Sequence, residues 1–535
     1  MPMGIGLAVR IWAVLAIAVA TLAPLPTQAQ KPGGTLKIYN STNPPSASIH
    51  EEATVAAVVP FAALFNNLVQ YDPAKPRNDL DAIVPELAES WSLDATRTKL
   101  TFKLHRGVMW HDGKPFTAKD VQCTFHRLNG KEPDFYRRNP RKAWYENLTE
   151  VTTSGDHEVT FHLGRPQPSF IGMLASHFTP IYPCHVLAKD MRTAPIGTGP
   201  FKLKELRSNE GALLVKNPDY WQKGLPYLDA IDWRIIANRS TRVLAFIAGE
   251  FDMTFVADIT VPIMRDITAQ APKSTCSLVP TNVPTNIIIN SEKKPFDNAD
   301  VRRAVGLAID RKAFVDIISE GKADIAAWML APPVGSWGMP AEEVAKLPGY
   351  GADVAAQQAE ARKIMEKLGY GPSNRLKVKL STRDFTSYRD PAVILVDQLN
   401  KVHFDAELDI IESSVWFNKL ARKDYVIGLN LSGVGIDDPD VTLGGGFGCK
   451  SEVNRTNYCN PVVEKLLDQQ SQEPDREKRK QLVWQIERIL VDDGARPVIF
   501  HNRSATCWHA HLKGYVHQEN SIYNAWRFDR VWLEK

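Results

Sequence analysis

The stretch from residue 376 to residue 431 constrains the fold most, because predicted strands and helices alternate along it. Periodic apolar residues and helix-start signals predict, in order, a strand at 376–380, a helix at about 390–402, a strand at 406–410, a helix at about 414–422 and a strand at 425–431. Strands separated by helices pair in parallel. This part of the chain therefore predicts a doubly wound α/β sheet, which binds ligands at the carboxyl ends of its strands.

The N-terminus carries the features of a cleaved secretory signal. Arg10 precedes an apolar run from Ile11 to Leu22, and the small-residue end TQA follows at 27–29. The run is shorter than the ~20 residues that a membrane-spanning helix needs, so a membrane anchor is the less favoured interpretation. We expect cleavage after Ala29. Because no cysteine stands there to accept a lipid, we expect a free periplasmic protein.

Charge and composition exclude two classes of partner. Removing residues 1–29 takes away one arginine and no acid, so the formal charge falls from +3 to +2. A nearly neutral chain lacks the concentrated basic surface that nucleic acid or an anionic bilayer requires. No later segment resembles a membrane-spanning helix. The remaining length of about 500 residues is too great for one core, so two or three domains are expected.

Further patterns lie between residues 91 and 121. Leu100, Phe102 and Leu104 alternate with polar residues as in a strand, and a tight basic turn follows. HDGKPF then leads into a helix whose N-terminus is marked by Thr117 and Asp120.

The middle of the chain predicts a hairpin and a second strand–helix–strand unit. PIGTGPFKLKEL with GALLVKNPDYW reads as the hairpin. A strand at 231–236, a helix at 239–248 stopped by Gly249, and a strand at 251–256 follow. Beyond them, Asp300 can cap a helix whose apolar residues Val301, Val305 and Ala308 share one face.

The motifs at 91–121, 196–221 and 286–313 together resemble the bacterial extracellular solute-binding proteins, family 5, the dipeptide, oligopeptide and nickel group. The resemblance covers residues 33 to 517. It implies a two-lobed periplasmic binding protein fold of the cluster C type, with mixed, largely parallel sheets and a hinge. We place lobe I at 30–283 plus 504–535, with an inserted subdomain at about 55–190, and lobe II at 284–503.

Six cysteines in an exported chain favour disulfides. The resemblance implies a bridge between Cys449 and Cys459, which bracket a short polar loop, because dipeptide-binding members carry a cystine at the matching place. The other four, namely Cys123, Cys184, Cys276 and Cys507, allow three connectivities that the sequence does not separate. We favour Cys276 with Cys507, since both lie beside the predicted hinge.

Candidate ligand-binding residues follow the strands of the 376–431 unit. Arg383 follows the first strand and Asp437 the third, while Trp416 begins the helix between them. A guanidinium can hold a carboxylate and a carboxylate can accept from an ammonium, which suits a zwitterion such as a peptide. The alternative is a solvated rim with a core tryptophan. Asp438 is a second candidate acid, although capping the following turn is its favoured role.

The resemblance strengthens this interpretation. Arg383 occupies the place of the carboxylate-binding arginine of dipeptide binders, Asp437 that of the amine-binding aspartate of dipeptide and oligopeptide binders, and Trp416 that of a pocket tryptophan. One departure counts against a peptide, because Val434 stands where the family has a second tryptophan. Pocket shape must therefore differ.

We therefore expect the periplasmic substrate-binding component of an ABC importer, a monomer that closes its lobes over a small peptide or peptide-like zwitterion and delivers it to the transmembrane permease subunits. The resemblance implies no catalytic residue, no cofactor and no enzyme. An alternative cargo is a metal chelate, haem, an opine or an aromatic acid, suggested by Val434 and by His501, Cys507, His509 and His511. A secreted zinc hydrolase that uses the same cluster is the remote alternative.

Overall fold

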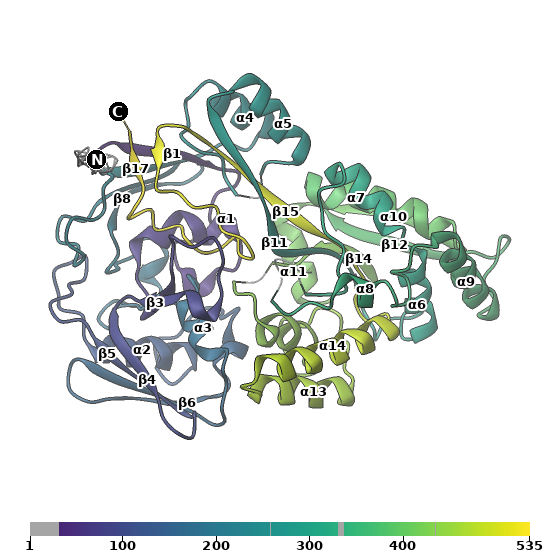
Figure 1. Ribbon diagram of the computed structural model, residues 1–535, viewed down its shortest axis with the longest axis horizontal. Coiled ribbons are helices and arrows are strands. Elements are labelled where there is room, and N and C mark those ends of the chain that lie inside the picture. Colours follow the sequence, from purple (N-terminus) through teal and green to yellow (C-terminus); the bar gives the residue numbers. More distant parts are fainter. Residues whose placement is uncertain (1–31, 257, 330–335, 434, 535) are drawn as a thin grey trace, which may run out of the picture.

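The computed structural model describes residues 32–256, 258–329, 336–433 and 435–534. The predicted signal peptide and Val434 lie outside these ranges. Figure 1 shows two lobes joined by crossing strands. The core of one consists mainly of buried apolar residues from 36–256 and 512–533, and the core of the other of residues from 287–500. We call these parts lobe I and lobe II; they confirm the predicted two-lobed α/β fold.

Lobe I is built on a four-stranded sheet in the order β1-β10-β9-β8. Its strands are β1 (Thr35–Asn40), β8 (Phe201–Arg207), β9 (Gly211–Lys216) and β10 (Ala230–Ile235). β8 and β9 form the predicted hairpin, and β1 pairs in parallel with β10. The strand predicted at 251–256 was wrong. The segment forms only single bridges, from Met253 to Ile38 and to Trp508, because its pairing with both neighbours is limited to this one residue.

A second sheet of lobe I is antiparallel and has the order β4-β5-β7-β6. Its strands are β4 (Ala88–Leu93), β5 (Lys99–Leu104), β6 (Leu148–Thr153) and β7 (Glu158–Leu163). Helix α2 (Ala118–Leu128) packs on β6 and β7 and begins with the predicted capping box. There the Thr117 backbone N–H donates to Asp120 Oδ2 over 2.9 Å. The sheet lies inside the range predicted for the inserted subdomain.

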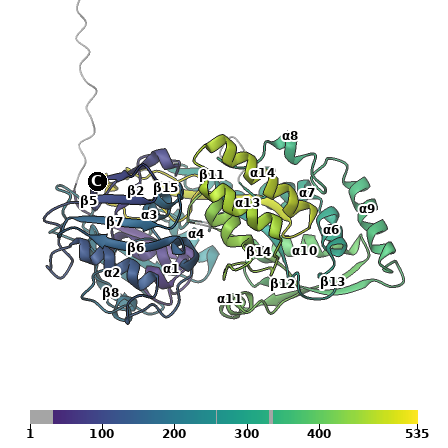
Figure 2. The ribbon, with the colours of Figure 1, turned by 90° about the horizontal axis from the view of Figure 1, so that it is seen from below.

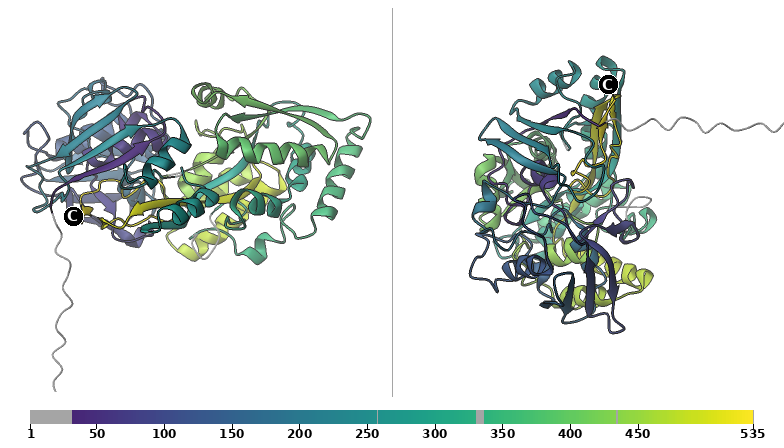
Figure 3. Two further views of the ribbon diagram at one scale, coloured as in Figure 1. Left: turned by 90° about the horizontal axis from the view of Figure 1, so that it is seen from above. Right: turned by 90° about the vertical axis from the view of Figure 1, so that its left-hand side faces the viewer.

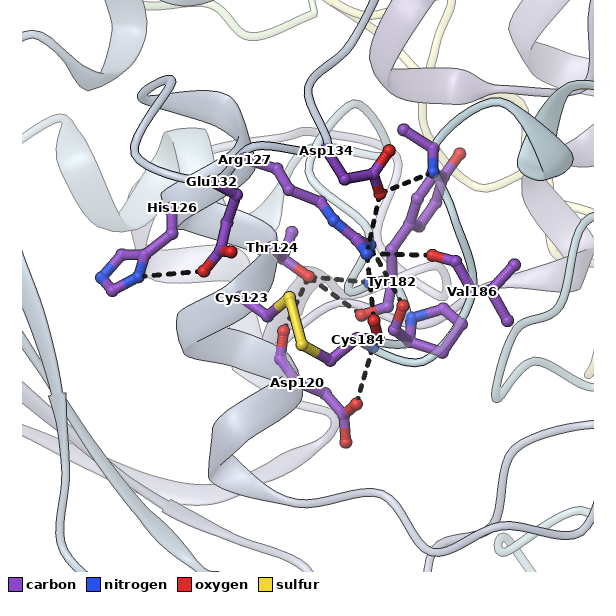
Figure 4. Close-up of a disulfide and its surroundings, with 12 residues drawn as sticks. Asp120, Cys123, Thr124, His126, Arg127, Glu132, Asp134, Tyr182, Cys184 and Val186 are labelled. Carbon is purple, nitrogen blue, oxygen red and sulfur yellow. Dashed lines mark hydrogen bonds and ion pairs between the residues drawn. A yellow bond between two sulfur atoms is a disulfide. The ribbon is translucent and has the colours of Figure 1, made fainter.

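A disulfide ties α2 to the segment that follows the second sheet. Figure 4 shows Cys123 on the helix bonded to Cys184. One turn along α2, the buried Arg127 guanidinium donates to the carbonyls of Pro183, Cys184 and Val186 over 2.9 to 3.1 Å. Covalent and charge-assisted contacts therefore hold the same segment against one helix.

Lobe II contains the mixed sheet β13-β12-β14-β11-β15. Its strands are β11 (Ser274–Ile289), β12 (Leu376–Arg383), β13 (Phe404–Ile411), β14 (Ile427–Leu431) and β15 (Val498–His509). β12 pairs in parallel with both β13 and β14, and α10 (Thr386–Asn400) and α11 (Ser413–Ala421) connect them. This confirms the predicted doubly wound order. Helix α10 starts one turn before the predicted position and contains Pro391 in its interior.

Lobe II also contains the longer helices α6 (Ala299–Ala308), α7 (Arg311–Ser319), α9 (Val354–Lys367), α13 (Pro461–Gln472) and α14 (Arg476–Asp492). Figures 1 and 2 place α13 and α14 beside lobe I and α9 at the far end of lobe II. The predicted cap of α6, Asp300, was wrong by two residues, because Asn298 accepts from the Asp300 backbone N–H and is the N-cap. Val301, Val305 and Ala308 are buried as predicted.

The long strands β11 and β15 run side by side from one lobe into the other, as Figures 1 and 3 show. Their antiparallel register shifts between Pro280 and Pro284, near the middle of β11. Cys276 lies opposite Cys507, and the two form a disulfide, which is the pairing we favoured. Cys449 and Cys459 form the third bridge. The lobe boundaries predicted at 283/284 and 503/504 fall on these strands, and we keep them as a proposal.

The other α-helices and strands lie outside these two groups of elements. They are α1 (Val55–Val58), α3 (Phe170–Ala175), α4 (Arg239–Ile247), α5 (Val261–Gln270), α8 (Ala341–Val344), α12 (Gly445–Phe447), β2 (Val69–Tyr71), β3 (Ile83–Pro85), β16 (Leu512–Lys513) and β17 (Trp532–Leu533). Among the described residues, no helix is both long enough and apolar enough to cross a membrane.

Candidate functional site

A cleft of about 2230 Å³ lies between the lobes, and residues of both lobes line it. The carboxyl ends of β12 and β14 border the cleft, through Arg383 and Leu431. At this place the chain leaves β12 toward β13 on one side and returns to β14 on the other, so the strand order reverses. Such a reversal separates the neighbouring loops and leaves a crevice, which is where doubly wound sheets bind ligands.

Arg383 is the last residue of β12 and is partly buried at the cleft. The centre of its guanidinium lies 5.1 Å from the ring centre of Phe385, 5.6 Å from that of Tyr388 and 5.2 Å from that of Phe417. Cations over aromatic faces are attracted by the ring quadrupole. Three aromatic side chains therefore surround this charge at the end of the strand.

Asp437 lies in the loop after β14 and is 9% exposed. Its Oδ2 accepts from the Asn520 side chain over 3.2 Å, and its backbone carbonyl accepts from Trp337 Nε1 over 2.9 Å. Its Oδ1 is a buried acceptor without a well-formed hydrogen bond among the described residues. Burial raises the pKa of Asp437 to about 6, the Asn520 amide lowers it, and the Asp438 charge raises it further.

The two other acids of the sequence DDPD have structural partners. Asp438 is buried and forms a bidentate pair with Arg479, with distances of 2.6 and 3.0 Å. It also accepts from the Asp440 backbone N–H over 2.9 Å, which is the turn-capping role favoured from the sequence. Asp438 does not line the cleft. Asp440 accepts from the Ser169 hydroxyl of lobe I over 2.5 Å and so links the lobes.

Trp416 does not lie where the sequence placed it. It is fully buried and packs with Ile288, Ile411, Leu420 and Tyr425 in a small core under the sheet. Because these apolar neighbours enclose its ring, Trp416 does not line the cleft, and the core interpretation holds in this structure. The aromatic residue of α11 that does line the cleft is its neighbour, Phe417.

The cluster of histidines near the C-terminus is dispersed into separate contacts. Cys507 is in a disulfide, His509 Nε2 lies 2.9 Å from the Phe246 carbonyl, and His511 Nε2 lies 2.7 Å from Asp252. Across the described ranges, no group of three His, Cys, Asp or Glu side chains could hold a metal ion. These contacts give no support to a zinc hydrolase or to a protein-bound metal at this place.

Sequence reasoning missed a row of polar side chains beside Arg383. Asn286 on β11 and Asn430 on β14 lie opposite each other in the register. Asn286 Oδ1 accepts from Arg496 Nε over 2.9 Å, and both amides contact the Ser432 hydroxyl. Asn286 and Asn430 interrupt strands that are otherwise apolar, in the stretches TNIII and IGLNL. That interruption, on two neighbouring strands, is the signal that could have found them.

Solved structures support the fold. The Escherichia coli murein tripeptide binding protein MppA matches with a TM-score of 0.83 at 20% identity, covering 95% of this chain and 99% of that one. AppA of Bacillus subtilis in complex with a nonapeptide matches with a TM-score of 0.81 at 22% identity, covering 95% and 100%. AgaA from A. tumefaciens R10 in complex with agropinic acid gives 0.80 at 21%, covering 94% and 99%.

Sequence comparison identifies the family. The probable di/tripeptide-binding protein 5 of Pseudomonas aeruginosa is 24% identical over 92% of this chain and 95% of its own length. The probable D,D-dipeptide-binding periplasmic protein DdpA of Escherichia coli is 26% identical over 84% and 85%. The model of the family "Bacterial extracellular solute-binding proteins, family 5 Middle" matches residues 82–453, well over half of the chain. The chain therefore belongs to the bacterial extracellular solute-binding proteins of family 5.

Proposed function

We propose that this protein is the periplasmic substrate-binding component of an ABC importer and captures a small peptide or a peptide-like zwitterion. The family is one of transporter substrate-binding proteins, and several relatives carry peptide-binding names. The cleft between the lobes is large enough for such a solute. Delivery to transmembrane permease subunits, and a monomeric state, belong to the same proposal.

Two charged residues of opposite sign at one cleft carry the proposal. Arg383 would hold the carboxylate of the ligand through charge-assisted hydrogen bonds, because a guanidinium presents two parallel N–H groups. Asp437 would accept from the ligand ammonium, because its Oδ1 is a buried acceptor with spare capacity. Phe417 and Phe385 offer apolar surface beside Arg383 for the body of the ligand.

Closure of the lobes would bury the ligand. The lobes are joined by β11 and β15, and contacts such as Arg165 with Asp468, at 3.4 Å, already bridge the cleft edge. Two strands that cross between lobes give a hinge, and hinge closure around a ligand is one common transition of binding proteins. Burial of the ligand charges away from water would then strengthen their pairing.

Calorimetric titration of the mature protein with matched peptides tests the proposal. A tripeptide with free termini should bind, and N-acetylation or C-amidation should each weaken binding by about tenfold or more. Arg383→Gln should weaken the free peptide but not the C-amidated one, and Asp437→Asn should weaken the free peptide but not the acetylated one. Equal losses for capped and free peptides in both variants would show that neither residue holds a terminus.

Opines are the second candidate cargo. AgaA and MoaA were solved with agropinic and mannopinic acid, and both share this fold. An opine also presents a carboxylate that Arg383 could hold, but it lacks a peptide's free ammonium at the far end. If opines bind and no free-terminus peptide binds detectably, this cargo is favoured and the receptor role is kept.

A further inference from the structure

Arg496 places a nearly buried positive charge in the cleft, away from Arg383. Its side chain is 7% exposed, lines the cleft and donates to Asn286 Oδ1 over 2.9 Å and to the Ser432 hydroxyl. Its guanidinium centre lies 5.1 Å from the ring centre of Trp328. Within the described ranges no carboxylate forms an ion pair with Arg496, and burying a charge without one is costly.

A second cation lies beside the first. Arg455 also lines the cleft, and within the described ranges no carboxylate forms an ion pair with it. Tyr425 interacts electrostatically with both guanidiniums, and its hydroxyl donates to the Arg455 backbone carbonyl. Burial lowers the pKa of Arg496 to about 10; Tyr425 opposes this effect and the Arg455 charge adds to it. Both guanidiniums therefore stand in an environment that lacks an anion.

The row of polar side chains described above, Asn286, Asn430 and Ser432, extends from the Arg496–Arg455 pair toward Arg383. The register of β12 and β14 pairs Ser381 with Gly428, and continuing it brings Arg383 level with Asn430. Asn430 lies opposite Asn286, which binds Arg496. Neighbouring strands are about 4.8 Å apart, so Arg383 and the Asn286 end of the row are separated by about 10 Å across the sheet. A ligand lying along the row could meet a guanidinium at each end.

We propose that Arg496 and Arg455 form a second anion subsite of the cleft, which takes a side-chain carboxylate of the ligand. The proposal rests on the proposed function and narrows it to peptide-like solutes that carry an acidic side chain. A carboxylate matches the vacant partner of a guanidinium in geometry and in charge. Asn430 Oδ1, which is buried without a hydrogen bond among the described residues, would accept from the N–H groups of the same ligand.

Matched peptides test the subsite by titration calorimetry. A tri-alanine scaffold carries Glu or its uncharged isostere Gln at each position in turn. The wild-type protein should bind the best Glu peptide about tenfold or more tightly than the corresponding Gln peptide. Arg496→Gln, and separately Arg455→Gln, should bring that ratio close to one while the Gln peptide keeps its affinity. Retained Gln-peptide affinity also shows that the variants fold.

Two further variants separate this proposal from the proposed function. Arg383→Gln should lower the affinities of Glu and Gln peptides by the same factor and keep their ratio. Arg503→Gln is the matched control, because it removes another cleft arginine that already pairs with Asp324 at 2.8 Å; it should also keep the ratio. A wild-type ratio near one, a ratio unchanged in Arg496→Gln, or an equal loss in Arg503→Gln would overturn the subsite.

If no peptide binds, the proposed function fails. The anion subsite is then tested by the binding of simple anions instead of peptides. Thermal unfolding is measured in glutarate and in sodium sulfate against sodium chloride of the same ionic strength. Sulfate also stabilises proteins by exclusion from their surfaces, so wild type is compared with Arg496→Gln. A larger stabilisation of wild type by either anion supports the subsite, and equal stabilisation of both proteins overturns it.

Discussion

Arg479 and Asp438 form a buried bidentate ion pair, with 2.6 and 3.0 Å between their nitrogen and oxygen atoms. The pair joins α14 to the loop that carries Asp437, and Trp337 Nε1 fixes the same loop through the Asp437 carbonyl. The Asp438 carboxylate is thus fully engaged. Its neighbour Asp437, by contrast, lines the cleft.

Removing one partner of the Arg479–Asp438 pair should destabilise the protein strongly. Asp438→Asn removes the bidentate partner of the buried Arg479 charge and leaves only Asp440, at 3.4 Å, so we expect the free energy of unfolding to fall by up to about 3–5 kcal/mol. Denaturant unfolding measures this change. The control is Asp384→Asn, whose carboxylate forms an exposed pair with Arg389 at 3.6 Å and should change stability by less than about 1 kcal/mol. Similar small effects of both variants would contradict the assignment of Asp438 to stability.

The ionisation of Asp437 should make the stability of the empty protein depend on pH. Its folded pKa of about 6 is above the ordinary value of 3.8, so the folded protein holds the proton more tightly than the unfolded chain does. The resulting stability is fully present below pH 3.8 and is lost as pH rises through 6. Asp437→Asn should therefore be more stable than wild type by roughly 2–3 kcal/mol at pH 8 and nearly equal at pH 4.

Urea unfolding of both proteins at the two pH values checks this prediction, and the difference between them isolates Asp437 from other titrating groups. An ammonium beside Asp437 should lower its pKa. Under the proposed function, a free-amine peptide should accordingly bind about tenfold more weakly at pH 5 than at pH 7, whereas its N-acetylated form should not. The same stability difference at pH 4 and pH 8 would contradict the raised pKa.

The fold could be predicted from sequence because its signals are local and periodic. The strands at 376–380 and 406–410 alternate cleanly, and Thr117 with Asp120 forms the capping box that their spacing indicates. The strand at 251–256 failed because its pairing depends on β1 and β15, which lie far away in the sequence. Asn298 was missed because Asn and Asp, two residues apart, are equally good helix caps.

Fewer residues of the candidate site than of the fold could be predicted from the sequence. Strand order places Arg383 and Asp437 at one cleft, since both follow strands of one parallel unit. No local pattern distinguishes Trp416 from Phe417, because adjacent residues of a helix point in different directions and only packing decides which is buried. Arg496 and Arg455 belong to segments remote from the 376–431 unit, and only the folded chain brings them to its edge.

Trp416 and Phe417 should therefore have separable effects. Trp416→Ala removes a fully buried ring and should cost about 3–5 kcal/mol of stability. Phe417 is 41% exposed and lies over Arg383, so Phe417→Ala should change stability by less than about 1 kcal/mol and weaken ligand binding. Denaturant unfolding and titration of the two variants measure both quantities. If Phe417→Ala cost the stability and left binding intact, the assignment of the two rings would have to be exchanged.

The glycines of the GTGPF motif should be irreplaceable for a steric reason. A Cβ on Gly197 would come within 1.8 Å of the Leu64 carbonyl oxygen, and one on Gly199 within 2.3 Å of the Leu64 carbonyl carbon. Both obstacles are backbone atoms that cannot rotate away. Gly197→Ala is therefore expected to destabilise the protein by about 3 kcal/mol or more in denaturant unfolding.

Gly371→Ala is the matched control, because a Cβ there would meet no atom within 4 Å. Reduced freedom of the unfolded chain should make that variant as stable as wild type or slightly more so. The hairpin of β8 and β9 begins at Phe201, the last residue of GTGPF, so a shift of this segment would also move one edge of the lobe I sheet. Equal stability of the two alanine variants would mean that Leu64 can yield, and the motif would then need an explanation other than close backbone packing.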